Sequence, residues 1–410
     1  MALSKAARAG APHRTLLRYI GPVATISIAQ LFGTSLWFSA NSAASDLMRT
    51  WHATAADIGL LTSAVQIGFI LGTLCMSLSG CADRFRASSI FVVCAIAGAA
   101  FNAGFAGLST GIASAAVFRF LVGVSLAGIY PLGMKLIVSW APERTGPALA
   151  QLVAMLTLGT ALPHGLRVIG ADLPWQQVIG ASSLLALLGA ALIFVLGDGP
   201  HLRRSPQQTR ARGIMSAFRN KEFRSSALGY FGHMWELYAF WTIVPLYVAR
   251  AALGEQVHLG GVSGLSFLII ASGTGGCLAG GYMSRRVGSA PVAAMALLIS
   301  GACSVVFALG WRDFAALPLF ILLLVWGASV VADSPQFSAL SAKACPPELI
   351  GSALAIQNSI GFALTVVSIA AVTNLFQKMG LDSAWLLLPG PVFGLIGFLP
   401  VLLKSGSRMD

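Results

Sequence analysis

Three charged residues, Arg119, Glu236 and Asp333, stand inside long apolar stretches of the chain. A charge near the middle of a bilayer costs about 2.5 to 3.5 kcal/mol on insertion scales, so it indicates a binding or ion-carrying group. Burial disfavours an ionised carboxylate, whereas a neighbouring guanidinium favours it. The balance predicts proton uptake and release, with Glu236 as the main proton carrier, Asp333 as a second coupling group and Arg119 as their positive partner. A permanent structural ion pair is the alternative interpretation.

Polar side chains form a stripe in the first apolar stretch. Gln30, Thr34, Trp37 and Asn41 are spaced by four, three and four residues, which places them on one face of a helix. Such a face is unfavourable toward lipid. It therefore predicts contacts with a solute, or else hydrogen bonds to a neighbouring helix.

Aromatic residues accompany the two carboxylates. His233 shares a helical face with Glu236, Trp326 shares one with Asp333, and Trp241 lies nearby in sequence. Carboxylates among rings indicate a partly dry pocket. We expect Arg119, His233, Trp241, Trp326 and the polar stripe of the first stretch to contact the solute.

The elements that carry these residues are membrane spans. Only 10% of the 410 residues are charged and 56% are hydrophobic, a balance that excludes an ordinary soluble domain. A span needs about 20 apolar residues. Twelve stretches qualify, near 19–43, 57–79, 88–108, 112–138, 147–169, 177–197, 226–250, 261–282, 290–310, 317–340, 351–376 and 383–403.

The chain is predicted to be an all-α polytopic membrane protein of two six-helix bundles. Residues 1–197 form the first bundle, 198–225 a basic cytoplasmic linker and 226–410 the second bundle. The halves resemble each other: Gly123, Pro131 and Pro142 recur 204 residues later as Gly327, Pro335 and Pro346, and Trp37 recurs as Trp241. Parallel repeats of this kind place a solute path at their shared interface.

The net charge of +12 reflects topology. With a cytoplasmic N-terminus, most of the 26 Lys and Arg residues lie on one side, and the other side holds only Arg49, Arg167, Arg250, Arg312 and Lys378. This positive-inside pattern puts both termini and the linker in the cytoplasm and argues against a nucleic-acid partner. The first apolar stretch lacks a cleavable signal pattern. The six cysteines form no CxxC pair, which argues against disulfides and a zinc site.

Two charged turns carry a family resemblance. The first reads Gly80-Cys-Ala-Asp83-Arg84-Phe-Arg86 and the second Gly281-Tyr-Met-Ser-Arg285-Arg286-Val-Gly288. With the helix count, the duplication and Arg119 to Gly123, they resemble the major facilitator superfamily, with its motif between helices 2 and 3 and a degenerate copy between helices 8 and 9. In the first copy Ser79 occupies the expected glycine position and Arg86 replaces the second glycine.

The resemblance implies roles for these residues. In this superfamily helices 1, 4, 7 and 10 line a central cavity, which places Arg119, Glu236 and Asp333 on lining helices. Asp83, Arg84, Arg285 and Arg286 are expected to act in gating, since a carboxylate at a helix end can lock one access state. Solvated turn residues are the alternative. The stretch Tyr130 to Arg144 is similar to bacterial permeases of the cyanate and nitrate type, which favours anion uptake, whereas Gly159 to Gly165 resembles a motif of proton antiporters and favours export.

The sequence therefore predicts a proton-coupled secondary transporter that moves a small organic solute across the bacterial inner membrane by alternating access. Anion uptake of the cyanate type and efflux of drugs or metabolites are alternatives within this class. A channel and a transporter-like sensor are the alternatives outside it. No metal cluster, ATP-binding loop or catalytic constellation is evident, so we expect no enzyme activity, catalytic residue, metal or cofactor. The partners expected are the solute, protons and membrane lipid, with the protein acting as a monomer.

Overall fold

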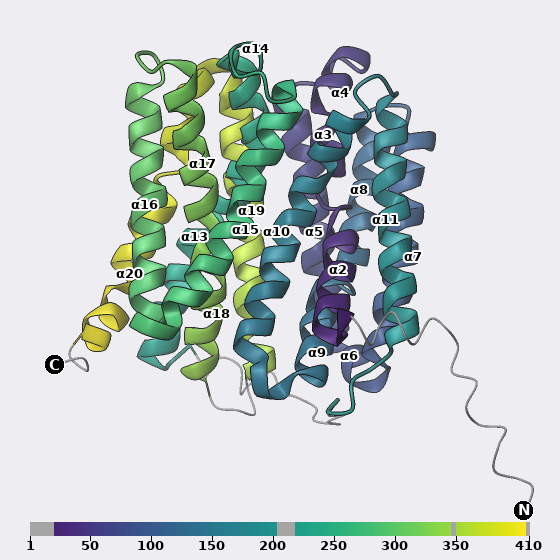
Figure 1. The fold of residues 1–410 in the computed structure, drawn as a ribbon, viewed down its shortest axis with the longest axis vertical. Helices are drawn as coiled ribbons and strands as arrows, with labels where there is room; N and C mark the ends of the chain where they lie inside the picture. The colour runs from purple at the N-terminus through teal and green to yellow at the C-terminus, as the bar shows by residue number, and fades with distance from the viewer. Residues whose placement is uncertain (1–19, 203–217, 346–349, 407–410) are drawn as a thin grey trace, which may run out of the picture.

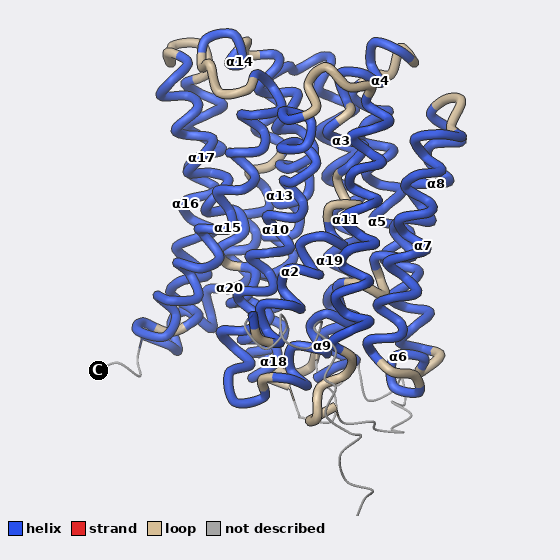
Figure 2. Tube along the Cα trace, turned by 45° about the vertical axis from the view of Figure 1, so that its right-hand side comes forward, coloured by secondary structure: helices blue, strands red, loops and turns tan. Residues whose placement is uncertain are grey.

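The computed structural model describes residues 20–202, 218–345 and 350–406. Within these ranges the chain is helical, with helices running roughly parallel and joined by short loops (Figure 2). Two groups of helices stand side by side, the first half of the chain at the right of Figure 1 and the second half at the left. We call the side on which α2 begins and α20 ends the terminal side.

The first half contains α2 (Pro22–Thr34), α3 (Ser39–Ser42), α4 (Ala44–Thr50), α5 (Ala55–Leu78), α6 (Cys81–Arg84), α7 (Ala87–Leu108), α8 (Ile112–Leu126), α9 (Tyr130–Trp140), η1 (Pro142–Arg144), α10 (Thr145–Ile169) and α11 (Trp175–Leu196). The second half contains α13 (Lys221–Arg250), α14 (Leu253–Gln256), α15 (Gly261–Val287), α16 (Ser289–Gly310), α17 (Ala316–Ala332), α18 (Ser334–Lys343), α19 (Ile350–Met379), η2 (Gly380–Leu386) and α20 (Pro389–Gly406). Thus α13 begins inside the segment predicted as a linker, of which residues 203–217 lie outside the described ranges.

Nine helical segments of the described chain are long and apolar enough to cross a membrane, one of which combines α19 and α20. The apolar helix α2 has only 13 residues. The 30-residue α13 is long enough, but its histidine, aromatic, glycine and proline residues make it less apolar than this set requires. The predicted count of twelve is therefore not reached by length and hydropathy alone.

Three spans that the sequence predicts as continuous are broken. The predicted span 19–43 is interrupted at residues 35–38, between α2 and α3, and the span 112–138 at residues 127–129, between α8 and α9. The span 317–340 is interrupted at Asp333, between α17 and α18. Pro131 and Pro335 stand in the first turn of α9 and α18, where proline is tolerated because its missing N–H would have no helical partner.

The packing of helices within each half follows the sequence repeat. A Cβ atom added to Gly123 of α8 would lie 2.0 Å from the carbonyl oxygen of Val65 in α5. A Cβ atom added to Gly327 of α17 would lie 2.0 Å from the carbonyl oxygen of Ile269 in α15. Both residues of the first contact shift by 204 positions to give the second. The repeat therefore extends to the backbone contacts that hold each half together.

Candidate functional site

A cavity of about 1060 Å³ lies between the two halves on the terminal side. The first half provides most of its wall, from α5, α9 and the start of α10, and α19 provides the second-half wall. Polar side chains include Thr73, Lys135, Ser139 and Asn358. The Lys135 ammonium donates a hydrogen bond to the carbonyl of Ala82, at 2.6 Å. The volume suits a small organic molecule.

An aromatic cluster closes the space between the halves. It comprises Trp37 and Phe69 of the first half with Tyr238, Trp241 and Phe362 of the second. Their ring centroids lie between 4.5 and 5.8 Å apart, the spacing of favourable aromatic pairs. All five side chains are buried. The cluster therefore bridges the interface and excludes water.

The helices α5 and α19 show on which side the interface is closed. At the end away from the terminal side, a Cβ atom added to Gly59 would lie 2.1 Å from the hydroxyl of Thr373, so the helices are in close contact. Midway, the rings of Phe69 and Phe362 meet at 4.5 Å. Farther on, Thr73 and Asn358 line the cavity. The described conformation is thus closed away from the terminal side and hollow on it.

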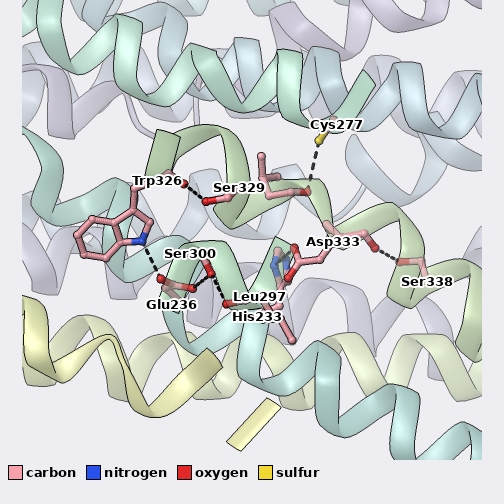
Figure 3. A network of polar contacts seen from close by, with 11 residues as sticks. His233, Glu236, Cys277, Leu297, Ser300, Trp326, Ser329, Asp333 and Ser338 are labelled. Atoms are coloured by element: carbon pink, nitrogen blue, oxygen red, sulfur yellow. Dashed lines mark hydrogen bonds and ion pairs between the residues drawn. The ribbon is translucent and has the colours of Figure 1, made fainter. Parts of the chain in front are cut away.

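Glu236 of α13 lies inside the second half, where its side chain is fully buried. Its Oε1 accepts a hydrogen bond from Trp326 Nε1 of α17 at 2.7 Å, and its Oε2 accepts one from the hydroxyl of Ser300 of α16 at 2.8 Å (Figure 3). That hydroxyl also lies 3.1 Å from the carbonyl of Leu297. Both donors to Glu236 are neutral, and no cation of the described residues forms an ion pair with it.

Asp333, at the junction of α17 and α18, contacts His233 of α13. Its Oδ1 lies 2.7 Å from Nδ1 of His233, and both side chains are almost wholly buried (Figure 3). The atoms are close enough for an ion pair. However, these two atoms do not form a hydrogen bond with each other in the described structure. The structure thus pairs one acidic candidate with a titratable histidine and leaves the other with neutral donors.

Arg119 of α8 is not joined to either carboxylate. Its fully buried guanidinium binds the break between α2 and α3, donating to the carbonyls of Leu36 at 3.0 Å and of Trp37. It also donates to Ser39 Oγ at 3.0 Å and to Asn102 Oδ1 at 3.2 Å. Arg119 is therefore not the positive partner of the two carboxylates in the described conformation, because its guanidinium binds main-chain and side-chain oxygens within its own half.

The polar stripe of the first span is divided between several neighbours. Trp37 Nε1 donates to Gln66 Oε1 at 3.1 Å and Asn41 Nδ2 to Thr62 Oγ1 at 3.0 Å, both on α5. Thr34 Oγ1 bonds the carbonyl of Gln30 at 2.8 Å. The two bonds to α5 are of the kind that the alternative interpretation expects, whereas the bond of Thr34 lies within α2.

Several predicted contact groups keep unused hydrogen-bonding capacity, Gln30 and Trp241 among them. Gln30 is fully buried, and its amide nitrogen and oxygen have no hydrogen-bond partner among the described residues. The same holds for the indole N–H of Trp241 in the aromatic cluster. A buried polar atom without a partner is costly, so both groups are candidates for binding a solute or water.

The predicted gating residues lie at the terminal side. Arg285 and Arg286, at the end of α15, place their guanidinium carbons 5.5 and 4.7 Å from the ring centroid of Tyr282. Arg84 is exposed at the end of α6. The side chain of Asp83 lies outside the described part of the structure. The described gating candidates therefore contact their own helix or solvent rather than the opposite half.

Comparison with known proteins identifies the family. The sequence model of the Major Facilitator Superfamily matches residues 26–369, which is most of the chain. The chain belongs to the Major Facilitator Superfamily. It is therefore a multi-pass membrane protein of a transporter family. Among curated protein sequences, none matches it at a significant level.

A solved structure of the superfamily has a similar fold. The nucleoside transporter NupG, crystallised in a mutant form, is 13% identical, with a TM-score of 0.72 over 94% of this chain and 100% of the other. At this identity the likeness concerns the fold alone.

The sequence did not predict two residues of the polar networks around Glu236 and Arg119. Ser300 of α16 donates to Glu236, and Asn102 of α7 accepts from Arg119. A single serine or asparagine in an apolar span is common, so neither gave a signal by itself. Only the partner's identity, which requires the fold, distinguishes them.

Proposed function

We propose that this protein is a proton-coupled secondary transporter that moves a small organic solute by alternating access. In this proposal twelve spans form two six-helix halves, both termini face the cytoplasm of the bacterial inner membrane, and the described conformation opens inward. The observation that supports it best is the position of Glu236, a buried carboxylate with neutral donors on the same helix as the interface rings Tyr238 and Trp241.

Glu236 is the proposed proton carrier because no cation among the described residues forms an ion pair with it. Gaining a proton removes a buried charge without requiring the separation of an ion pair. Protonation would at the same time change the carboxylate that accepts the hydrogen bond from Trp326 Nε1. Because α13 also carries Tyr238 and Trp241, a change at Glu236 can reach the aromatic cluster through one helix. Asp333 and His233 form the proposed second coupling group.

Replacement of Glu236 by glutamine tests this role without disrupting the packing. The amide oxygen still accepts from Trp326, and the amide nitrogen can donate to Ser300 Oγ, whose proton then turns to the Leu297 carbonyl. Each bond is preserved, so we expect an unfolding free energy within about 1 kcal/mol of the wild type. We expect transport driven by a pH gradient to be lost while solute exchange without a gradient is retained.

The assay uses purified protein in proteoliposomes, with uptake and counterflow measured separately for each solute of a panel of nucleosides, small acids, amines and drugs. Glu255→Gln is the matched control, because Glu255 is exposed in α14. A Glu236→Gln protein that still accumulates solute against its gradient would show that another group carries the proton. A current without saturation would instead support a channel.

The hydrogen bonds of Arg119 to the break between α2 and α3 bear on the type of solute. Anion uptake was expected from Arg119 and Lys135 together with the resemblance to cyanate-type permeases, and the terminal nitrogens of Arg119 already bind carbonyl, hydroxyl and amide oxygens. This argues against an anion-specific carrier of the cyanate type, and it is the reason to test every class of solute in the panel. Gln30 and Trp241 remain the proposed solute contacts.

A further inference from the structure

A second cavity, of about 390 Å³, opens among helix ends of the second half at the terminal side. Its walls come from the start of α13, the end of α15, the start of α16, and the ends of α18 and α20, which gather at the lower left of Figure 1. Three cations line it, namely Arg286, Lys343 and Lys404. The single acidic lining residue, Glu222, is ion-paired with Lys404. The cavity therefore has an excess of positive charge.

The remaining wall combines a helix N-terminus with apolar side chains. Gly288 is the N-cap of α16 and offers no side chain to the first-turn amides, a place where anions are stabilised. Val287, Leu340 and Val401 also line the cavity. Positive and apolar walls together suit an amphiphile whose polar end is an anion.

The first half shows what fills the equivalent place. At the start of α7, the counterpart of α16, Asp198 Oδ1 accepts a hydrogen bond from the backbone N–H of Ser88 at 2.8 Å. The other oxygen of Asp198 pairs with Arg86 Nε at 3.3 Å. At the corresponding start of α16, no described side chain accepts a hydrogen bond from the first-turn amides, and the cationic cavity lies there instead.

We propose that this cavity binds the phosphate of an anionic phospholipid headgroup, which takes the place that Asp198 occupies in the first half. The phosphate lies between Arg286 and Lys343 at the start of α16, and the apolar wall meets the glycerol and upper acyl region. The position at the ends of the membrane helices and the apolar wall favour a lipid over free phosphate.

Thermal unfolding of the purified full chain in neutral detergent tests the site, with phosphatidylglycerol, phosphatidylcholine or inorganic phosphate added. We expect phosphatidylglycerol to raise the Tm more than the other two. The double variant R286Q/K343Q should bind phosphatidylglycerol about tenfold more weakly, because charged hydrogen bonds are lost. The matched control K221Q/R224Q removes the same charge nearby without touching the cavity wall and should retain the full shift.

A third variant, Val401→Asp, places a carboxylate in the cavity wall. It should abolish the preference for phosphatidylglycerol by occupying the cationic cavity from within. Equal stabilisation by phosphatidylglycerol and phosphatidylcholine, or an equal loss in K221Q/R224Q, would overturn the proposal. Stabilisation by inorganic phosphate that matches phosphatidylglycerol would overturn the lipid assignment. If Val401→Asp fails to fold, the comparison of the two double variants still decides.

Discussion

Replacement of Arg119 by methionine should destabilise the first half. Besides Ser39 Oγ, three buried acceptors share its donors: the carbonyls of Leu36 and Trp37 and the Oδ1 of Asn102. The hydroxyl of Ser39, 3.2 Å from Leu36 O and 2.7 Å from Asn102 Oδ1, has one proton and can serve one of them. Two acceptors are left without a donor, at about 1 to 3 kcal/mol each. Relief of the buried charge offsets part of this, so we expect a loss of about 2 to 4 kcal/mol.

Unfolding of the purified protein by a denaturing detergent measures this loss. Arg49→Met is the control, because the Arg49 side chain is 79% exposed and its partner Asp46 keeps an ion pair with Arg167, and it should cost less than about 1 kcal/mol. A double-mutant cycle with Asn102→Ala should be non-additive, since both changes break one network. If Arg119→Met unfolds like the wild type and yet fails to transport, the guanidinium serves the solute and the reasoning is wrong.

Three further predictions concern packing, charge and capping. Gly123→Ala should cost about 2 kcal/mol of unfolding free energy, because the added methyl meets backbone, whereas Gly275→Ala, with open space around it, should cost nothing measurable in the same titration. Hydrogen bonds from Arg312 hold the pKa of Asp382 below its usual 3.8, so its contribution is present above that value and is lost as the pH falls through the folded pKa. The Tm deficit of Asp382→Asn should therefore be full at pH 7 and shrink as the pH falls below 3.8, and a deficit that stays constant through this range would contradict this origin. Thr54→Ala removes the capping box at the start of α5 and should cost about 1 kcal/mol, measured against the neighbouring exposed change His52→Ala.

The sequence was informative about the fold because hydropathy and repetition act over long distances. Runs of apolar residues located the helices, and the recurrence of Gly123 as Gly327 matched a recurring contact between helices. The breaks were missed because hydropathy does not depend on backbone geometry. Residues 35–38 are as apolar as their neighbours, so hydropathy does not mark the break. The structure shows it, because the carbonyls of Leu36 and Trp37 accept hydrogen bonds from Arg119.

The candidate site was only partly predictable. Helical spacing placed His233 beside Glu236 on one face, and the structure adds that their partners are Asp333 and Trp326 respectively. Arg119 does not contact these carboxylates, contrary to the expectation. The sequence assigns Arg119 to a helix, but it does not tell which neighbouring helix the Arg119 side chain faces. The predicted roles in proton coupling, solute binding and gating remain predictions.

The bridging of the two halves by aromatic rings gives the protein a built-in optical reporter. Trp37 and Trp241 occupy equivalent positions of the repeat, and each contacts Tyr238 in the buried cluster. If the halves separate at this cluster, both indoles pass from an apolar environment into water, where tryptophan emission moves to longer wavelength. A switch between access states would then be visible in unlabelled protein as a red shift, and Trp37→Phe would reduce its amplitude.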